Sequence, residues 1–164
     1  MNPTATCLAA GAAAVALLAL ASRAAPPLAY VNESPSLPKG LYLRRLDPSL
    51  RRGVVVVVAQ PPAVRGYLAG LRMPADVRLI KRVVAARGDP VCARDGALRW
   101  PGGKALALSV DRRGAPLPVW RGCRRLAADE LLIMGDTPTS FDSRYFGPVR
   151  AAAVEGVYRE MLTW

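Results

Sequence analysis

The chain has 164 residues, 52% of them apolar, a formal net charge of +11 and no histidine. Without histidine, a Ser-His-Asp triad, a Cys-His pair and any histidine-dependent zinc site are excluded, and we expect neither a metal nor a cofactor. With 14 Gly and 15 Pro, the composition is too rich in turn formers for a helical bundle and favours one membrane-associated domain.

The positive charge comes from 23 Lys and Arg residues, of which three are lysines. An excess of this size is compatible with a polyanionic partner or with an anionic membrane surface. The arginines are dispersed along the chain, however, and they do not alternate with aromatic residues as in proteins that bind single-stranded nucleic acid. The excess of arginine over lysine is better explained by codon bias than by a nucleic-acid-binding surface, and we expect no nucleic-acid partner.

Residues 5–21 form an uncharged, apolar segment. As a helix they would span about 26 Å, slightly less than the hydrocarbon core of a bilayer. A membrane anchor and a cleaved secretory signal both fit, since Ala19 to Ala21 before Ser22 resembles a small-residue cleavage site, and Arg23 is weak evidence for the reverse orientation. We divide the chain into an anchor or signal-like segment (residues 1–22), a linker (residues 23–31) and a folded domain (residues 32–164).

Two serines follow this segment in the sequence Asn-Glu-Ser-Pro-Ser-Leu-Pro-Lys-Gly-Leu-Tyr, residues 32–42. Pro35 lies between Ser34 and Ser36 and fixes its own φ, so both hydroxyls lie on a stiff, irregular stretch rather than on a helix. Such a stretch suits a nucleophile. Ser, Pro and Gly are also the commonest loop residues, so a plain linker is the alternative.

The rest of the chain predicts mainly strands. Val54 to Val58 gives the strongest prediction, because five consecutive valines indicate a strand that is covered on both faces. Ala63 to Leu71 has the length of a short helix, whereas Val154 to Leu162 fits a strand or a helix equally well. Further strands are expected at residues 41–43, 77–86, 97–100, 105–110 and 131–134, joined by turns that contain Gly and Pro.

Lys81 lies within the expected strand 77–86, where it alternates with Leu79, Val83 and Ala85 as a member of the inward row would. Burial disfavours the ammonium form and lowers the pKa of a lysine, which makes the neutral amine available as a general base. A serine can be activated in this way without histidine. The alternative is a lysine that extends to solvent from the edge of the strand.

Three ordered motifs carry a family resemblance: residues 34–42, residues 81–89, and Met-Gly-Asp-Thr-Pro-Thr-Ser-Phe-Asp-Ser-Arg-Tyr-Phe-Gly-Pro-Val at 134–149. Together they resemble the type I signal peptidases, serine/lysine peptidases, and the Ser-Leu-Pro-Lys-Gly-Leu-Tyr form is closest to the conjugative-transfer, TraF-like branch. Leu37 replaces the usual methionine, and Thr137 to Thr139 replace a polar run. The resemblance implies an antiparallel β-sheet or coiled-barrel domain with one N-terminal transmembrane helix.

The resemblance also implies roles for four residues. Ser36 would be the nucleophile, and Lys81 would take its proton. The Ser36 backbone N–H and the Ser34 hydroxyl would form the oxyanion hole, which is physically reasonable because Pro35 has no N–H to donate. Ser140 would hydrogen-bond the lysine and orient it, although it could equally cap a turn.

Asp136, Asp142 and Arg144 would form a charged cluster that holds the last motif against the lysine strand. The alternative for Asp142 and Arg144 is an exposed ion pair of little energetic weight. Between residues 92 and 121 the chain resembles the variable insertion of the family. Cys92 and Cys123 flank it in an exported domain, so we expect them to form a disulfide.

The sequence therefore predicts a membrane-anchored serine endopeptidase with its catalytic domain outside the bacterial cytoplasmic membrane. Its expected partners are membrane lipid and an exported precursor protein with small residues before the scissile bond, for the conjugative branch a pilin-like one. A housekeeping signal peptidase and a non-catalytic membrane-anchored β module remain alternatives. A LexA-like self-cleaving protein would need a DNA-binding domain where this chain has an apolar segment. The distance between Ser36 and Lys81 discriminates between the catalytic and non-catalytic alternatives.

Overall fold

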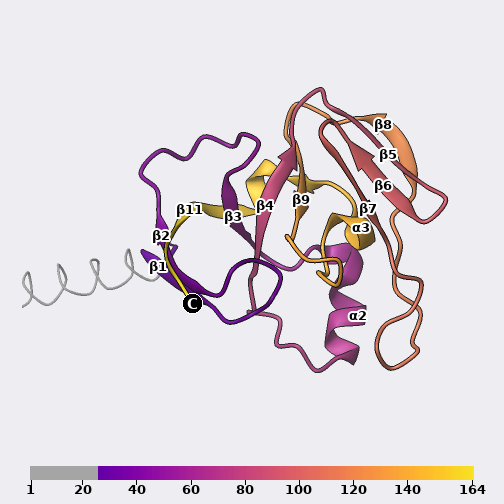
Figure 1. The fold of residues 1–164 in the computed structure, drawn as a ribbon, viewed down its shortest axis with the longest axis horizontal. Helices are drawn as coiled ribbons and strands as arrows, with labels where there is room; N and C mark the ends of the chain where they lie inside the picture. Colours follow the sequence, from indigo (N-terminus) through magenta and orange to yellow (C-terminus); the bar gives the residue numbers. More distant parts are fainter. Residues whose placement is uncertain (1–25) are drawn as a thin grey trace, which may run out of the picture.

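A computed structural model describes residues 26–164, which form two β-sheets with a shared core (Figure 1). All eleven strands pair in antiparallel fashion, so the predicted mostly β, antiparallel fold class is confirmed. The predicted transmembrane segment, residues 5–21, lies outside the described residues. Within residues 26–164, no helix has the length and hydropathy needed to cross a membrane.

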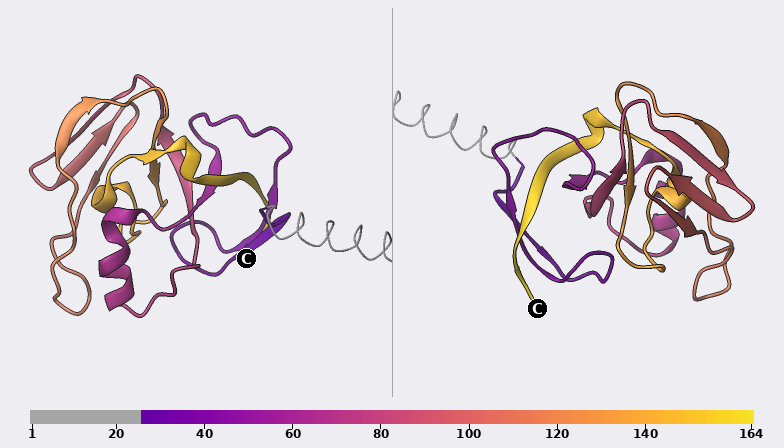
Figure 2. Two further views of the ribbon diagram at one scale, coloured as in Figure 1. Left: turned by 180° about the vertical axis from the view of Figure 1, so that it is seen from behind. Right: turned by 45° about the horizontal axis from the view of Figure 1, so that its top comes forward.

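The larger sheet, here called the large sheet, is an open half-barrel with β1 and β10 at its edges (Figure 2). Its seven strands, in spatial order, are β1 (Ala29–Asn32), β2 (Gly40–Arg44), β11 (Val154–Thr163), β3 (Val55–Val58), β4 (Leu79–Ala85), β9 (Glu130–Met134) and β10 (Val149–Arg150). The small sheet has the four strands β7 (Gly103–Leu106), β6 (Ala97–Trp100), β5 (Pro90–Arg94) and β8 (Gly122–Arg125). The helices are η1 (Pro62–Val64), α2 (Arg65–Gly70), α3 (Ser143–Phe146) and η2 (Ala151–Ala153).

β3 and β4 form the buried centre of the large sheet. Every residue from Val55 to Val58 is buried, which confirms the prediction from the valine run. In β4 burial alternates, with Leu79, Lys81, Val83 and Ala85 buried and the residues between them partly exposed. Lys81 is therefore held in the core by the same two-residue periodicity that buries its apolar neighbours.

The segment Val154 to Leu162, for which the sequence fits a strand or a helix equally well, forms a strand. β11 pairs with β2 on one side and with β3 on the other, with irregularities in register after Val154 and after Glu160. Both neighbouring strands would otherwise leave backbone N–H and C=O groups unpaired, which local helix propensity cannot offset. β11 is thus the strand that joins the β1–β2 hairpin to the rest of the large sheet.

The small sheet packs one face on β9 and on the end of β4, at the end of the molecule opposite to β1 and β2 (Figures 1 and 2). Cys92 on β5 and Cys123 on β8 lie directly opposite each other and form a disulfide. The helix expected over Ala63–Leu71 is present as η1 followed by α2. It contributes Val64 and Leu68 to the core between it and the large sheet.

Candidate active site

The two serines lie on the connection between β1 and β2, residues 33–39, here called the serine loop. Asn32, which is buried, donates from Nδ2 to the carbonyl oxygens of Ser34, Leu37 and Pro38 at 3.0, 3.1 and 3.1 Å, and its Oδ1 accepts from Ser34 N at 3.1 Å. The Tyr42 hydroxyl donates to the Pro38 carbonyl at 2.7 Å. These bonds satisfy backbone groups that have no strand partner and hold the loop in one conformation.

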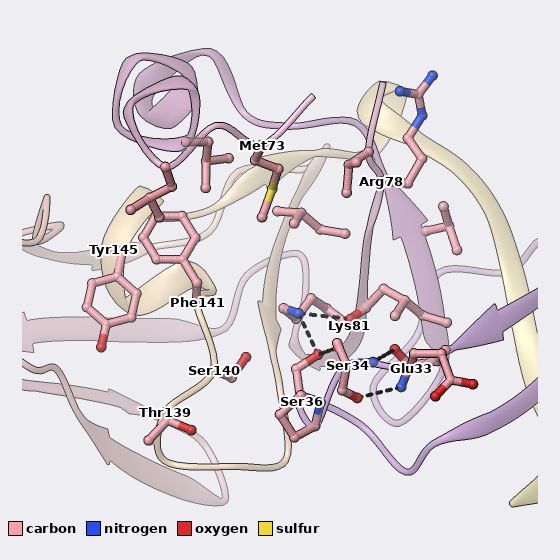
Figure 3. Close-up of a pocket in the computed structure, with 18 of the residues that line it drawn as sticks. Glu33, Ser34, Ser36, Met73, Arg78, Lys81, Thr139, Ser140, Phe141 and Tyr145 are labelled. Carbon is pink, nitrogen blue, oxygen red and sulfur yellow. Dashed lines mark hydrogen bonds between the residues drawn. The ribbon is translucent and has the colours of Figure 1, made fainter. Parts of the chain in front are cut away.

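Lys81 and Ser36 meet beneath this loop (Figure 3). Lys81 Nζ donates to Ser36 Oγ at 2.9 Å and to the Ile80 carbonyl at 3.0 Å, and the two side chains come from residues that are only 4% and 7% exposed. Burial lowers the pKa of Lys81 from 10.5 to about 8, although the nearby Asp142 carboxylate opposes that shift. The lysine is therefore partly neutral near neutral pH and lies within reach of the serine proton.

Ser34 Oγ lies 2.8 Å from Ser36 Oγ, on the solvent side of the pair. Its backbone N–H is already bonded to Asn32, so its hydroxyl is the group that faces the nucleophile. This distance fits a side-chain donor for an oxyanion that forms next to Ser36.

Ser140 is buried beside the pair, but it does not make the hydrogen bond to Lys81 that the family resemblance implies. Its Oγ has no partner among the described residues. Ser140 instead packs against Gly135, where a Cβ would overlap the Ser140 side chain and lie 2.7 Å from the Ser36 carbonyl oxygen. Lys81 Nζ is directed at Ser36 and the Ile80 carbonyl, while the Ser140 hydroxyl points toward the space beside them (Figure 3).

Gly135 and Asp136, directly after β9, also contact the serine loop. The backbone N–H of Asp136 donates to the Ser36 carbonyl at 2.6 Å, a bond that requires the close approach that Gly135 permits. In the sequence, Gly135 is recognisable only as part of the last motif. Its structural role depends on the contact between the end of β9 and the serine loop, which no local sequence pattern reveals.

Asp142 and Arg144 form an ion pair that is buried and not exposed. Their side chains are 0% and 2% exposed, and the guanidinium donates to both carboxylate oxygens at 2.8 and 2.7 Å. The remaining Arg144 donors bond the carbonyls of Thr137, Pro138 and Ser140, while Gly135 N donates to the Asp142 carboxylate. The pair therefore fixes the whole loop that carries Ser140.

Asp136 does not belong to this cluster, which corrects the prediction. Its carboxylate accepts from Arg82 Nε and Nη2 at 3.1 and 2.9 Å, and Arg82 also bonds Glu160 at 2.9 Å. Arg82 follows Lys81 in β4, so its side chain lies on the opposite face of the sheet. Asp136 still ties the loop to the lysine strand, but through a half-exposed network that sequence reasoning missed.

Ser36 and Lys81 line a cleft of about 1180 Å³. Part of its lining is apolar and aromatic, with Met73, Phe141 and Tyr145 labelled in Figure 3, and the Phe141 ring stacks on Tyr145. The charged residues Glu33 and Arg78 also line the cleft. The cleft is somewhat larger than most small-molecule sites, which span about 300 to 1,000 Å³.

An antiparallel β domain in which a buried lysine bonds a loop serine is the arrangement expected of the signal peptidases. The profile of the signal peptidase family, peptidase S26, matches residues 4–164, and the chain belongs to that family.

Within the family the chain is TraF-like. It is 39% identical over 163 residues to a plasmid transfer protein TraF of Escherichia coli, covering 91% of either chain. A second Escherichia coli plasmid transfer protein TraF is 36% identical over 166 residues, covering 93% of this chain and 92% of the relative. A probable conjugal transfer protein TraF of Sinorhizobium fredii is 33% identical over 147 residues, covering 82% and 77%. A crystal structure of a signal peptidase I from Enterococcus faecalis is 23% identical, with a TM-score of 0.39 over 66% of this chain and 96% of that one.

Proposed function

We propose that this protein is a membrane-anchored serine endopeptidase that cleaves exported precursor proteins with a dyad of Ser36 and Lys81. The observation that carries the proposal is the 2.9 Å hydrogen bond between Lys81 Nζ and Ser36 Oγ in a largely buried site. A non-catalytic β module would have no reason to bury a lysine against a serine, because burial of the charged form is unfavourable.

In the acylation step, neutral Lys81 Nζ accepts the proton of Ser36 Oγ as that oxygen attacks the scissile carbonyl carbon. The carbonyl oxygen becomes an oxyanion, which the Ser36 backbone N–H and the Ser34 hydroxyl stabilise. The Lys81 ammonium then donates its proton to the leaving amine, and the acyl group stays on Ser36. In the second step, neutral Lys81 takes a proton from a water molecule as that water attacks the ester carbonyl carbon. The Lys81 ammonium then returns the proton to Ser36 Oγ as the ester C–O bond breaks, which releases the carboxyl product and regenerates both residues.

Asp142 and Arg144 support this chemistry without touching the substrate. They hold the loop from Thr137 to Ser140 in place, and Thr137, Thr139 and Ser140 of this loop line the same cleft as Lys81. Burial keeps the pKa of Lys81 low, as a general base near neutral pH requires.

The relatives named plasmid transfer protein TraF support a role in conjugative transfer. On the family resemblance, the substrate would carry small residues before the scissile bond, and for this branch a pilin-like precursor is the proposed substrate. A housekeeping signal peptidase is the alternative, and cleavage assays with precursors of both kinds distinguish the two.

An apolar stripe supports the membrane location. Val31 on β1, Leu41 on β2 and Leu162 on β11 are cross-strand neighbours on one face, and Val31 and Leu162 are largely exposed. Leu28 and Trp164 are exposed close by in the chain. Such a stripe, which includes the first strand after residues 5–21 in the sequence, suits contact with a lipid surface.

Incubation of the detergent-solubilised full-length protein with a labelled precursor tests the proposal. Ser36→Ala and Lys81→Arg should each lower kcat/KM by a factor of about 1000 or more, because arginine cannot act as a base near neutral pH. Ser140→Ala should lose less. Lys104→Arg and Ser109→Ala, the same substitutions at exposed positions, are the matched controls. Near wild-type cleavage by Lys81→Arg would refute the dyad.

A further inference from the structure

The outer face of the small sheet carries one basic residue from each of its four strands: Arg94, Arg99, Lys104 and Arg125. All four are exposed, and within residues 26–164 no carboxylate lies at salt-bridge distance from any of them. This set, here called the basic face, is scattered over thirty-two positions of sequence and is brought together only by the fold. The active site does not use it.

Strand register shows that these residues share one face. Arg99 on β6 lies opposite Lys104 on β7 and opposite Cys92 on β5, and Cys92 in turn lies opposite Cys123 on β8. Arg94 follows Cys92 by two residues on β5, and Arg125 follows Cys123 by two residues on β8. Each arginine therefore lies on the same side of the sheet as its cysteine. The other side carries Val91, Leu98 and Ala105, which pack in the shared core.

Fold stability does not account for this arrangement. Lys104 on β7 and Arg125 on β8 could protect these two edge strands from pairing with other chains. Arg94 and Arg99, however, lie on the two central strands, where no edge needs protection. Arg99 directly opposite Lys104 is a like-charge pair, which destabilises a sheet.

We propose that the basic face binds an acidic polypeptide segment of a partner protein. Guanidinium groups bind carboxylates in bidentate fashion, and the disulfide between β5 and β8 fixes the spacing of the strands before any partner binds. The proposal does not depend on the peptidase activity.

Two other anionic partners fit the surface less well. Single-stranded nucleic acid requires aromatic side chains for stacking, and Trp100, the aromatic residue in the small sheet, packs in the shared core. A lipid surface that contacts the apolar stripe on β1, β2 and β11 lies at the opposite end of the molecule (Figures 1 and 2). Both surfaces cannot rest on one membrane plane.

The test compares two variants of equal net charge by fluorescence anisotropy with a labelled oligoglutamate peptide. Arg94→Glu/Arg99→Glu/Lys104→Glu alters the basic face, and the control alters three exposed arginines elsewhere, Arg51→Glu/Arg72→Glu/Arg159→Glu. Each variant lowers the net charge from +11 to about +5, because three charges reverse. Phosphatidylglycerol vesicles and an oligothymidylate strand are measured with the same proteins, and precursor cleavage and circular dichroism verify that each variant is folded.

We expect the basic-face variant to weaken peptide binding about tenfold or more, and the control variant to weaken it less than about threefold. If the triple reversal fails to fold, Arg94→Gln/Arg99→Gln should reproduce a smaller loss. Equal losses in the two variants would attribute binding to net charge and overturn the proposal. Absence of peptide binding by the wild type, or face-specific binding of DNA or vesicles but not of the peptide, would also overturn it.

Discussion

Lys81 Nζ lies 2.9 Å from Ser36 Oγ. The carboxylate that raises the pKa of Lys81 most is that of Asp142, which is already hydrogen-bonded to Arg144. Among residues 26–164, the lysine thus has hydrogen-bond acceptors but no ion-pair partner of its own. Burial therefore outweighs charge attraction and lowers the pKa.

The first prediction concerns pH. Because the pKa of Lys81 is lowered to about 8, kcat/KM for precursor cleavage should rise about tenfold per pH unit below that value and level off above it. Asp136 raises this pKa slightly, so Asp136→Asn should move the midpoint of the profile to lower pH. A profile that falls between weakly acidic and weakly alkaline pH would contradict the role of Lys81 as a base.

The second prediction concerns stability. The pKa of Lys81 is about 8 in the folded protein and near 10.5 when unfolded, so the unfolded chain binds the proton more tightly. The resulting penalty on folding, about 3 kcal/mol, is complete below pH 8 and disappears as pH rises past 10.5. Lys81→Met should therefore raise the free energy of unfolding by up to about 3 kcal/mol at pH 7 and by much less at pH 10.

Urea denaturation at both pH values measures this difference. Lys104→Met, at an exposed lysine, is the control and should change stability by less than about 0.5 kcal/mol. Equal effects of Lys81→Met at the two pH values would show that packing, and not charge, explains any gain.

The third prediction separates the buried ion pair from an exposed one. Arg144→Met should lower the free energy of unfolding by about 3 to 5 kcal/mol, because Asp142 would keep an uncompensated charge in the core. Arg150→Met removes an exposed pair with Asp129 and should cost less than about 1 kcal/mol. Similar losses in urea denaturation would mean that the Asp142 charge is relieved by solvent.

The fourth prediction concerns Asn32 as a positioning residue. Asn32→Ala leaves three buried or partly buried carbonyls of the serine loop without their donor and should cost about 1 to 3 kcal/mol of stability. Gln60→Ala is a matched control, since Gln60 is also buried and donates to two carbonyls, those of Pro74 and Val77. We expect only Asn32→Ala to lower kcat strongly, with a smaller effect on KM. Parallel loss of kcat in both variants would argue for a general stability effect.

The fifth prediction concerns the disulfide. Cys92 and Cys123 are 31 positions apart, and in the chain-entropy model a crosslink over such a loop contributes about 3 to 4 kcal/mol. Cys92→Ala/Cys123→Ala should lower stability by that amount in oxidising buffer and should be insensitive to reductant. Two free thiols at these positions in non-reducing mass spectrometry of the exported protein would contradict the crosslink.

The parts of the fold that follow from local periodicity could be read from the sequence. The valine run of β3 and the alternation around Lys81 each specify a strand and its buried face without reference to the rest of the chain. The short helix that begins at Pro62 could likewise be predicted from the local sequence alone.

Features that depend on distant partners could not be predicted. β11 is a strand because β2 and β3 flank it, and Asp136 bonds Arg82 because β9 ends at Met134, which pairs with Arg82 in the middle of β4. The hydroxyl of Ser140 has no partner within residues 26–164, and Lys81 Nζ donates to Ser36 and to the Ile80 carbonyl instead. Dispersed arginines gave no sign of the basic face, since only the register of the small sheet gathers them.

The position of β11 sets the order in which the site can be assembled during synthesis. The serine loop connects β1 to β2, and that hairpin reaches the lysine strand through β11, which follows every other strand that the structure describes. Ser36 therefore emerges from the ribosome about 120 residues before the strand that completes its scaffold, several seconds earlier at typical rates of synthesis. A peptidase built in this way would stay inert as a nascent chain and become competent only after its final strand has docked.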